Sequence, residues 1–223
     1  MSAPEMATDL DIRYGYLTEP YLKEAAKLGA DAFLDSASYK AMLPDDSDLR
    51  RSFLEFLFER NYWLRLNSNS CCCTFNGNEL IGFIMLVKPN IPNVSLLDML
   101  RVGMLRVPFQ FGFLTIFRLL SLKDWFETRQ KEVLSKLGKT NNDIVHLERM
   151  SVLPKYQGKG IGTMTLARAL KEEVNLPCFL STQSESNVKF YEKLGFTVVD
   201  HTQVPLNGGF PNWMMIREPT TEI

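Results

Sequence analysis

The sequence predicts a single α/β domain in which seven strands are flanked by helices. Its 223 residues fall within the size range of one domain. Hydrophobic residues make up 45% of the chain and charged residues 23%, which provides enough apolar side chains for a sizeable core. Short segments with strand character alternate along the chain with segments of helical period, as expected of an α/β fold.

Residues 12–87 are predicted to form three strands and two helices. A helix can begin at Pro20, and a second one begins at Asp48 after a Pro-Asp-Asp-Ser break. The last two strands are joined by an Asn-Gly-Asn turn, which indicates a hairpin. The apolar face of the first helix is expected to hold Ala25, Leu28, Gly29, Ala32 and Phe33. The strands are expected at 12–17, 71–75 and 80–87.

Residues 88–140 are predicted to be an insertion between the third and fourth strands. The segment begins irregularly, and only 125–137 has the pattern of an amphipathic helix, which ends at Gly138. Its phenylalanines could line a pocket or cover the sheet, and the basic residues that flank them also allow an interfacial amphipathic helix. The phenylalanines are at positions 109, 111, 113 and 117.

Residues 143–217 are predicted to complete the sheet with four strands and two helices. The first of these helices carries an apolar stripe. In the second, four residues share the face directed at the core, and Gly195 is the expected C-terminal cap. The strands are expected at 143–153, 178–182, 196–204 and 213–217. The helix residues are Ile161, Met164, Ala167, Leu170 and Val174 in the first helix, and Asn187, Phe190, Tyr191 and Leu194 in the second.

Composition excludes several classes of protein. The formal net charge of -1 predicts no general attraction to nucleic acid or to acidic membranes. Cys71, Cys72, Cys73 and Cys178 have neither zinc-ligand spacing nor the arrangement of a disulfide framework, so we expect no metal site and a reducing compartment. The first residues lack a signal-peptide pattern, and no run of eighteen apolar residues occurs. We therefore expect a soluble cytoplasmic protein, with the nucleus as an alternative compartment.

A glycine-dense turn between a predicted strand and a predicted helix indicates a phosphate site. Gly158, Gly160 and Gly162 leave the backbone N–H groups open to close approach, and the positive end of the helix dipole points to the same place. The G-x-G-x-G spacing does not fit the nucleoside-triphosphate loop or the dinucleotide fingerprint. A turn without a ligand is the alternative interpretation.

The stretch V-x-P-x-x-Q-G-x-G-x-G, residues 152–162, closely resembles the acetyl-CoA loop of the GCN5-related N-acetyltransferase (GNAT) superfamily. Residues 187–196 resemble its second hallmark, an Asn and a Tyr on one helix followed by Gly-Phe. Within the superfamily, residues 144–217 most resemble the puromycin N-acetyltransferase branch. The resemblance implies a mixed, mostly antiparallel, seven-stranded sheet, an acetyl-CoA-binding core at 143–217, and a helical insertion that borders the acceptor site.

The resemblance also implies roles for individual residues. Tyr191 would be the general acid for the coenzyme A sulfur, and Asn187 would hydrogen-bond the pantetheine arm. The alternatives are a packed tyrosine and a residue that starts the helix. In the family the strand before the loop offers backbone N–H groups to the thioester. The acetyl-CoA site would consist of Met150, Ser151, Val152, Gln157, Gly158, Lys159, Gly160, Ile161, Gly162, Thr163, Asn187 and Tyr191.

Two residues on the strand before the loop are candidates for the general base. His146 and Glu148 alternate, so they are expected to share a face. A partly buried Glu148 could take the proton of the ammonium group directly or through water. Glu148 pairing with Arg149, and His146 as a core histidine, are the alternatives. Ser181 stands where the puromycin-type branch carries a glutamate, which makes puromycin doubtful as a substrate and favours Glu148.

These expectations combine into one predicted function. The protein is expected to transfer an acetyl group from acetyl-CoA to a primary amine of a small molecule, by direct attack in a ternary complex. The alternatives are a peptide or protein N-acetyltransferase and a non-catalytic acyl-CoA-binding module. The sequence does not predict the acceptor amine, the pathway or the oligomeric state.

Overall fold

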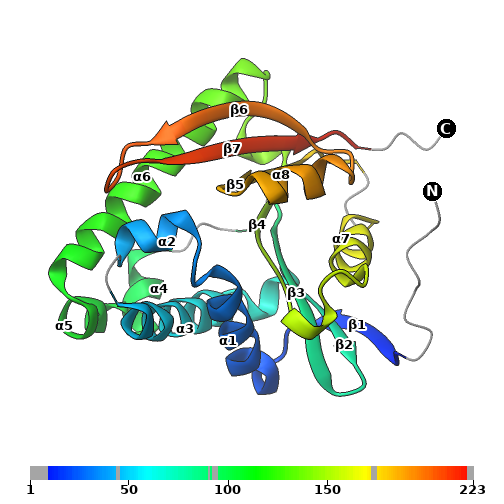
Figure 1. Ribbon diagram of the computed structural model, residues 1–223, viewed down its shortest axis with the longest axis horizontal. Coiled ribbons are helices and arrows are strands. Elements are labelled where there is room, and N and C mark those ends of the chain that lie inside the picture. The colour runs from blue at the N-terminus through cyan, green and yellow to red at the C-terminus, as the bar shows by residue number, and fades with distance from the viewer. Residues whose placement is uncertain (1–9, 44–45, 90, 92–94, 172–174, 220–223) are drawn as a thin grey trace.

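A seven-stranded sheet forms the centre of the protein in the computed structural model (Figure 1). The strand order is β1-β2-β3-β4-β5-β7-β6, and all neighbours are antiparallel except β4 and β5. The sheet is therefore mixed and mostly antiparallel, as the family resemblance implied. The strands are β1 Ile12–Tyr16, β2 Cys71–Asn76, β3 Glu79–Val87, β4 Val145–Val152, β5 Cys178–Thr182, β6 Thr197–Val204 and β7 Phe210–Arg217. The structure describes residues 10–43, 46–89, 91, 95–171 and 175–219.

Eight α-helices lie in the described ranges. They are α1 Leu22–Phe33, α2 Ala37–Met42, α3 Ser47–Trp63, α4 Leu96–Arg101, α5 Val107–Phe111, α6 Phe113–Lys136, α7 Ile161–Lys171 and α8 Glu185–Glu192. Short 3-10 helices occur at Glu19–Tyr21, Leu66–Ser68, Met104–Arg106, Asn141–Asp143 and Pro154–Tyr156.

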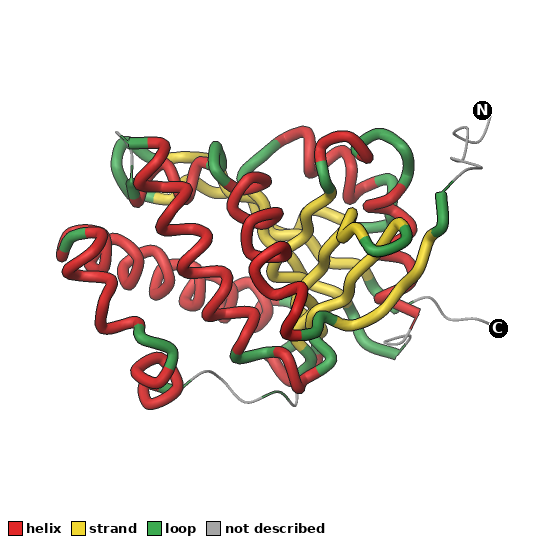
Figure 2. The backbone as a smooth tube through the Cα atoms, turned by 90° about the horizontal axis from the view of Figure 1, so that it is seen from below, coloured by secondary structure: helices red, strands yellow, loops and turns green. Residues whose placement is uncertain are grey.

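The helices divide the core between the two faces of the sheet. One face, called the front face here, is covered by α1 to α3 over β2 and β3, and by α6 over β5 and β7. On the opposite face, called the back face, α7 and α8 pack against β3 to β5 and β7. Figure 2, seen from below, has the front helices before the strands. Strand alternation explains the division, because Phe83 and Met85 point to the front core while Ile84 and Leu86 point to the back.

The second strand follows the same rule. Cys71 and Cys73 are buried in the front core, and Cys72 packs against the back core, in keeping with strand alternation. Asn76 and Gly77 then turn the chain into β3, with Gly77 at φ +58°. The predicted hairpin is therefore confirmed.

Two helices depart from the sequence-based expectation. Helix α2 was not predicted, because its six residues are too few to display a helical period. Helix α6 begins at Phe113 and not at Trp125. Its first three turns were not predicted. Phe113, Phe117 and Leu120 are apolar but exposed, so this part of the sequence lacks the apolar face and the polar face that identify an amphipathic helix.

The apolar stripes of α1 and α7 differ in part from the predicted ones. Ala32 and Ala167 are exposed, and Val174 lies outside the described residues. The buried positions are instead Leu22, Ala25, Ala26, Leu28, Gly29 and Ala30 in α1, and Ile161, Thr165, Leu166 and Ala169 in α7. Within the described ranges, no helix combines the length and the apolar character that a bilayer span requires.

Candidate active site

The glycine turn between β4 and α7 needs its first two glycines for backbone conformation. Gly158 and Gly160 have φ angles of +75° and +81°, in the left-handed region that favours glycine. A Cβ at either position would meet no atom within 4 Å, so the space beside the loop is open. Open space beside an unencumbered backbone, at the start of a helix, is the geometry that a pyrophosphate requires.

Gly162 lies where α7 packs closely on β4. A Cβ at this position would lie 2.6 Å from Met150 Cε, the end of a flexible side chain that would have to shift. The neighbouring Ile161 is buried in the core, so only its main chain faces the loop, while Thr163 is exposed. Gln157 Nε2 donates to the carbonyl oxygen of Val152 at 3.0 Å and ties the loop to the end of β4.

The two lysines of the loop have different environments. Lys155 Nζ lies 2.6 Å from Glu79 Oε1 on the β2–β3 hairpin, and the hydroxyl of Tyr156 donates to the other oxygen of Glu79 at 2.9 Å. Lys159 is exposed, with its ammonium group 5.3 Å from the centre of the Tyr156 ring. Lys159, which the sequence assigned to the acetyl-CoA site, is therefore the loop lysine that remains available to a phosphate.

Strand β4 parts from β5 just before the loop. It pairs with β3 along its length, but with β5 only from Val145 to Leu147. Beyond Leu147, one edge of β4 has no partner strand among the described residues, so backbone groups of Met150, Ser151 and Val152 on that edge can bind a ligand. This opening is where the sequence predicted main-chain contacts to the thioester.

A β-bulge at Glu148 decides which face the following side chains occupy. In the ladder with β3, Leu86 pairs with Leu147 and Met85 pairs with Arg149, so Glu148 is left without a partner in register. The extra residue reverses the alternation beyond it. Simple alternation, on which the shared face of His146 and Glu148 was predicted, therefore does not hold along the whole of β4.

The consequence is visible at two side chains. Arg149 points to the front, where its guanidinium carbon lies 4.8 Å from the centre of the Phe58 ring. Met150 points to the back, where its sulfur accepts a long hydrogen bond from the Tyr191 hydroxyl at 3.9 Å. Ser151 is buried and pairs in register with Phe83 of the front core, and its Oγ has no hydrogen-bond partner among the described residues.

Tyr191 lies on the back face with its ring in the core. Its ring packs against Phe190 and Phe196, with centroids 5.2 and 5.5 Å away. Burial raises the pKa of Tyr191 far above its usual value of 10.0, so the phenol is protonated at neutral pH and can act as a donor. Asn187, one turn earlier on α8, is exposed, and its Nδ2 donates to Thr182 Oγ1 at 3.2 Å.

His146 and Glu148 are close enough to interact. Burial lowers the pKa of His146, and the nearby Glu148 carboxylate opposes this shift. The His146 ring lies 5.9 Å from the ring of Phe179, so it belongs to the front of the sheet. Glu148 lies in an exposed position, and its Oε2 is 3.3 Å from Arg149 Nη1. Both sequence alternatives, a candidate base and an ion pair with Arg149, are thus compatible with its position.

The position of the missing puromycin-type glutamate is occupied by a small polar network. The hydroxyl of Ser181 donates to Asn212 Oδ1 at 2.6 Å, and Gln183 Nε2 donates to the same oxygen at 2.8 Å. Asn212 is fully buried, and its Nδ2 has no partner among the described residues. The network supplies hydrogen-bonding groups but no carboxylate, in line with the expectation from the sequence.

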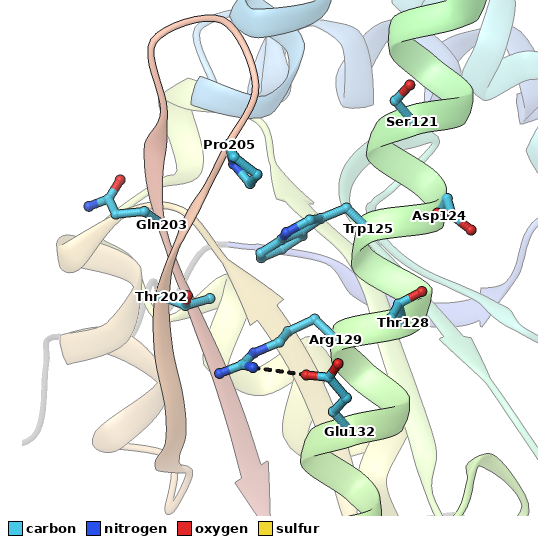
Figure 3. A pocket seen from close by; sticks show the side chains of 9 residues that line it. All are labelled: Ser121, Asp124, Trp125, Thr128, Arg129, Glu132, Thr202, Gln203 and Pro205. Carbon is cyan, nitrogen blue, oxygen red and sulfur yellow. Dashed lines mark hydrogen bonds and ion pairs between the residues drawn. The ribbon is translucent and has the colours of Figure 1, made fainter.

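A surface groove of about 560 Å3 lies between α6 and β6, away from these residues (Figure 3). Arg129 crosses it and pairs with both oxygens of Asp200, at 2.6 and 3.0 Å, and with Glu132 at 2.9 Å. No predicted site residue lines it, so we do not assign it to the transfer reaction. Its lining consists of Ser121, Asp124, Trp125, Thr128, Arg129, Glu132, Thr202, Gln203 and Pro205.

Comparison with known proteins identifies the domain. Residues 126–198 match the family model described as an acetyltransferase (GNAT) domain. The chain carries a GNAT acetyltransferase domain. The match runs from α6 to the start of β6, so it includes the bulge, the glycine loop and Tyr191.

The GNAT domain shares its fold with solved acetyltransferases. Arylalkylamine N-acetyltransferase 2 from Aedes aegypti has a TM-score of 0.61 and 13% identity, covering 94% of this chain and 100% of that one. PaiA N-acetyltransferase from Thermoplasma acidophilum, in complex with coenzyme A, has a TM-score of 0.53 and 17% identity, with coverage of 94% and 99%. YncA from Salmonella typhimurium, with acetyl-CoA, has a TM-score of 0.53 and 13% identity, with coverage of 95% and 95%.

Residues 126–198 form a GNAT acetyltransferase domain, which confirms the predicted superfamily and the predicted acyltransferase class. The predicted co-substrate, acetyl-CoA, agrees with the coenzyme A and acetyl-CoA held by the PaiA and YncA structures. The resemblance to the puromycin branch and the role of each site residue remain predictions. Among the described residues, no group of three or more His, Cys, Asp or Glu side chains is arranged to hold a metal ion.

Several residues on the front face of the sheet were missed by sequence reasoning. Arg149 was considered only as a partner of Glu148, and Tyr39, Tyr62 and Asn212 were not considered. Tyr39 and Tyr62 come from α2 and α3, more than eighty residues before β4. Only the tertiary packing brings them to Arg149, so no local pattern could have indicated them.

The buried His146 gives the GNAT domain a predictable dependence on pH. Because the pKa of His146 is lowered from 6.5 in the folded state, the unfolded chain binds more protons as the pH falls below 6.5. The contribution to stability is complete above that pH and is lost towards the folded-state pKa, with a slope of at most about 1.4 kcal/mol per pH unit. Urea unfolding between pH 7 and pH 5 measures it. We expect His146→Gln to flatten this slope, and equal slopes in both proteins would contradict the assignment.

Proposed function

We propose that this protein is an N-acetyltransferase that moves the acetyl group of acetyl-CoA to the primary amine of a small molecule, by direct attack in a ternary complex. The observation that carries the proposal is the position of Glu148 and Tyr191 around one strand. The bulge presents Glu148 on β4 next to front-face residues, and two positions later Met150 contacts the hydroxyl of Tyr191 from the back. A candidate base and a candidate acid thus flank the strand edge that faces the opening from β5.

The donor side is supported by the loop and the strand edge. The N–H groups around Gly158 and Gly160 would hold the pyrophosphate of acetyl-CoA, with Lys159 as a nearby cation. The open edge of β4 would hold the thioester oxygen through backbone N–H groups, which stabilise the charge that develops there during attack. The pyrophosphate would fit there because the space beside the two left-handed glycines is open, and any side chain at those positions would reduce that space.

The acid and base then complete the proton balance. As the amine nitrogen forms its bond to the acetyl carbon and the carbon–sulfur bond breaks, Glu148 takes the proton that the nitrogen loses. The departing sulfur takes the proton of Tyr191, whose hydroxyl is already directed at a sulfur atom, that of Met150. His146 is a second candidate for the proton path, since its lowered pKa leaves it uncharged at neutral pH.

Direct attack is also supported by the protonation of three buried cysteine thiols. Burial raises the pKa of Cys71 and Cys178 to about 12, and that of Cys73 still further. These three thiols therefore stay protonated near neutral pH and are poor nucleophiles. An acetyl-cysteine intermediate on any of them is not favoured.

A panel of acceptors tests the proposal. Release of free thiol from acetyl-CoA is followed with arylalkylamines, polyamines, amino acids and short peptides. Arylalkylamines are included because the Aedes aegypti enzyme of similar fold carries that substrate class in its name. Turnover with small amines above that with peptides is the expected result. Preference for peptides would favour the protein acetyltransferase, and binding of acetyl-CoA without turnover would favour the acyl-CoA-binding module.

A further inference from the structure

The front side of β4 holds a cation that the acetyl transfer itself does not require. Arg149 is mostly buried, with 15% of its side chain exposed, and Glu148 beside it is 29% exposed. Its guanidinium lies over the ring of Phe58 at 4.8 Å. A buried arginine is costly unless its charge and its N–H groups are satisfied, so its partners show how complete the site is.

Among the described residues, the hydrogen-bond partners of Arg149 do not account for all of its N–H groups. Its Nη1 approaches Glu148 Oε2 at 3.3 Å and the sulfur of Met85 at 3.6 Å, and it also has a hydrogen bond with Tyr39. A guanidinium has five N–H groups in a fixed fork, and these three acceptors use fewer than five. The contact with Glu148 involves one nitrogen and one oxygen, so it lacks the two parallel bonds of the strongest arginine–carboxylate pairs.

A second polar group in the same place also lacks a partner. The hydroxyl of Tyr62 is fully buried and has no hydrogen-bond partner among the described residues. It packs against Gly29 of α1, and although burial raises the pKa of Tyr62, the nearby Arg149 guanidinium opposes this shift. The Tyr62 ring packs between Phe58 and Phe83, with centroids 5.7 and 4.4 Å away, so the hydroxyl cannot easily turn to solvent. Buried groups without a hydrogen-bond partner are rare in proteins, so the Tyr62 hydroxyl calls for an explanation.

We propose that Arg149, with Tyr62 beside it, binds a carboxylate of the acceptor, so that the acceptor is an amino acid or a similar amine that bears a carboxylate. The inference rests on the proposed N-acetyltransferase function. Glu148 and Arg149 place opposite charges next to each other, which matches the adjacent ammonium and carboxylate groups of an amino acid. The amine would face Glu148, where its proton is removed. The carboxylate would accept hydrogen bonds from the remaining N–H groups of Arg149.

Matched acceptors test the inference in the unaltered protein. The kcat/KM for phenylalanine is compared with that for phenethylamine, and tyrosine is compared with tyramine, because each pair differs only in the carboxylate. We expect the carboxylated member to be preferred, by about 10- to 100-fold for a charge-assisted contact. Equal or lower kcat/KM for the carboxylated members would overturn the inference while leaving the proposed function intact. No turnover with any amine would instead overturn the proposed function.

The variant Arg149→Met separates binding of the carboxylate from a packing role. Methionine keeps contact with Phe58 but removes the charge and the N–H groups. We expect the ratio of kcat/KM for phenylalanine over phenethylamine to fall by about 10- to 100-fold, mainly through KM. Arg149→Lys should recover part of the ratio, and Arg51→Met, which removes an arginine of α3 that pairs with Asp31, should not change it. An unchanged ratio in Arg149→Met would contradict the inference. If that variant does not fold, the comparison in the unaltered protein decides.

Discussion

Replacing Tyr191 by phenylalanine is expected to lower kcat by about 100-fold or more, the usual contribution of a general acid. The change removes only the hydroxyl. The ring keeps its contacts with Phe190 and Phe196, so the back core and the affinity for acetyl-CoA should change little. Steady-state kinetics with a saturating amine, together with titration of acetyl-CoA, separate the two effects.

The control for this prediction is Tyr14→Phe, which removes the hydroxyl of a partly exposed tyrosine on β1. It should leave kcat unchanged. If Tyr191→Phe has the same kcat as the unaltered protein, the sulfur is protonated in another way, and Tyr191 is a packed core residue whose hydroxyl only contacts Met150.

Replacing Glu148 by glutamine is expected to lower kcat/KM at neutral pH by about 100-fold, within the range for loss of a general base. The reason is that the amide has a similar size and shape but cannot take the proton that the amine loses. The measurement is kcat/KM for one amine at pH 7.

Glu19→Gln is a suitable control, since Glu19 is exposed at the start of the 3-10 helix Glu19–Tyr21. Thermal melting should accompany the kinetics, because Glu148→Gln also weakens the contact with the buried Arg149. A variant that melts at the same temperature and keeps the full kcat/KM would remove Glu148 as the base and leave His146 as the remaining candidate.

The strands could be predicted well because their signals are local. The Asn-Gly-Asn turn and the apolar runs on either side of it determine β2 and β3 with their immediate neighbours alone. The insertion could not be predicted in the same way. Phe109, Phe113 and Phe117 are 82%, 71% and 67% exposed, so the usual link between apolar residues and the core fails there. Of the four phenylalanines, Phe111 packs on Phe53 in the front core.

The candidate site was predictable on its donor side only. The glycine loop, the open strand and the tyrosine of α8 follow one another within residues 145–192, so spacing along the chain carries the information. The acceptor side depends on the bulge at Glu148, which is a property of the register between β3 and β4. No single-strand pattern indicates that register, and simple alternation from His146 would place Arg149 on the face opposite to the one it occupies.

The central claim is that the glycine loop and the open edge of β4 form an acetyl-CoA site. Isothermal titration of the protein with acetyl-CoA tests it most directly, with Gly160→Ala as the matched variant. We predict one site per chain with a dissociation constant between about 1 μM and 1 mM, the range of typical substrate KM values. The variant should bind more weakly, because alanine is strained at a φ of +81°. No heat of binding at millimolar acetyl-CoA, from a protein that is folded by circular dichroism, would contradict the claim.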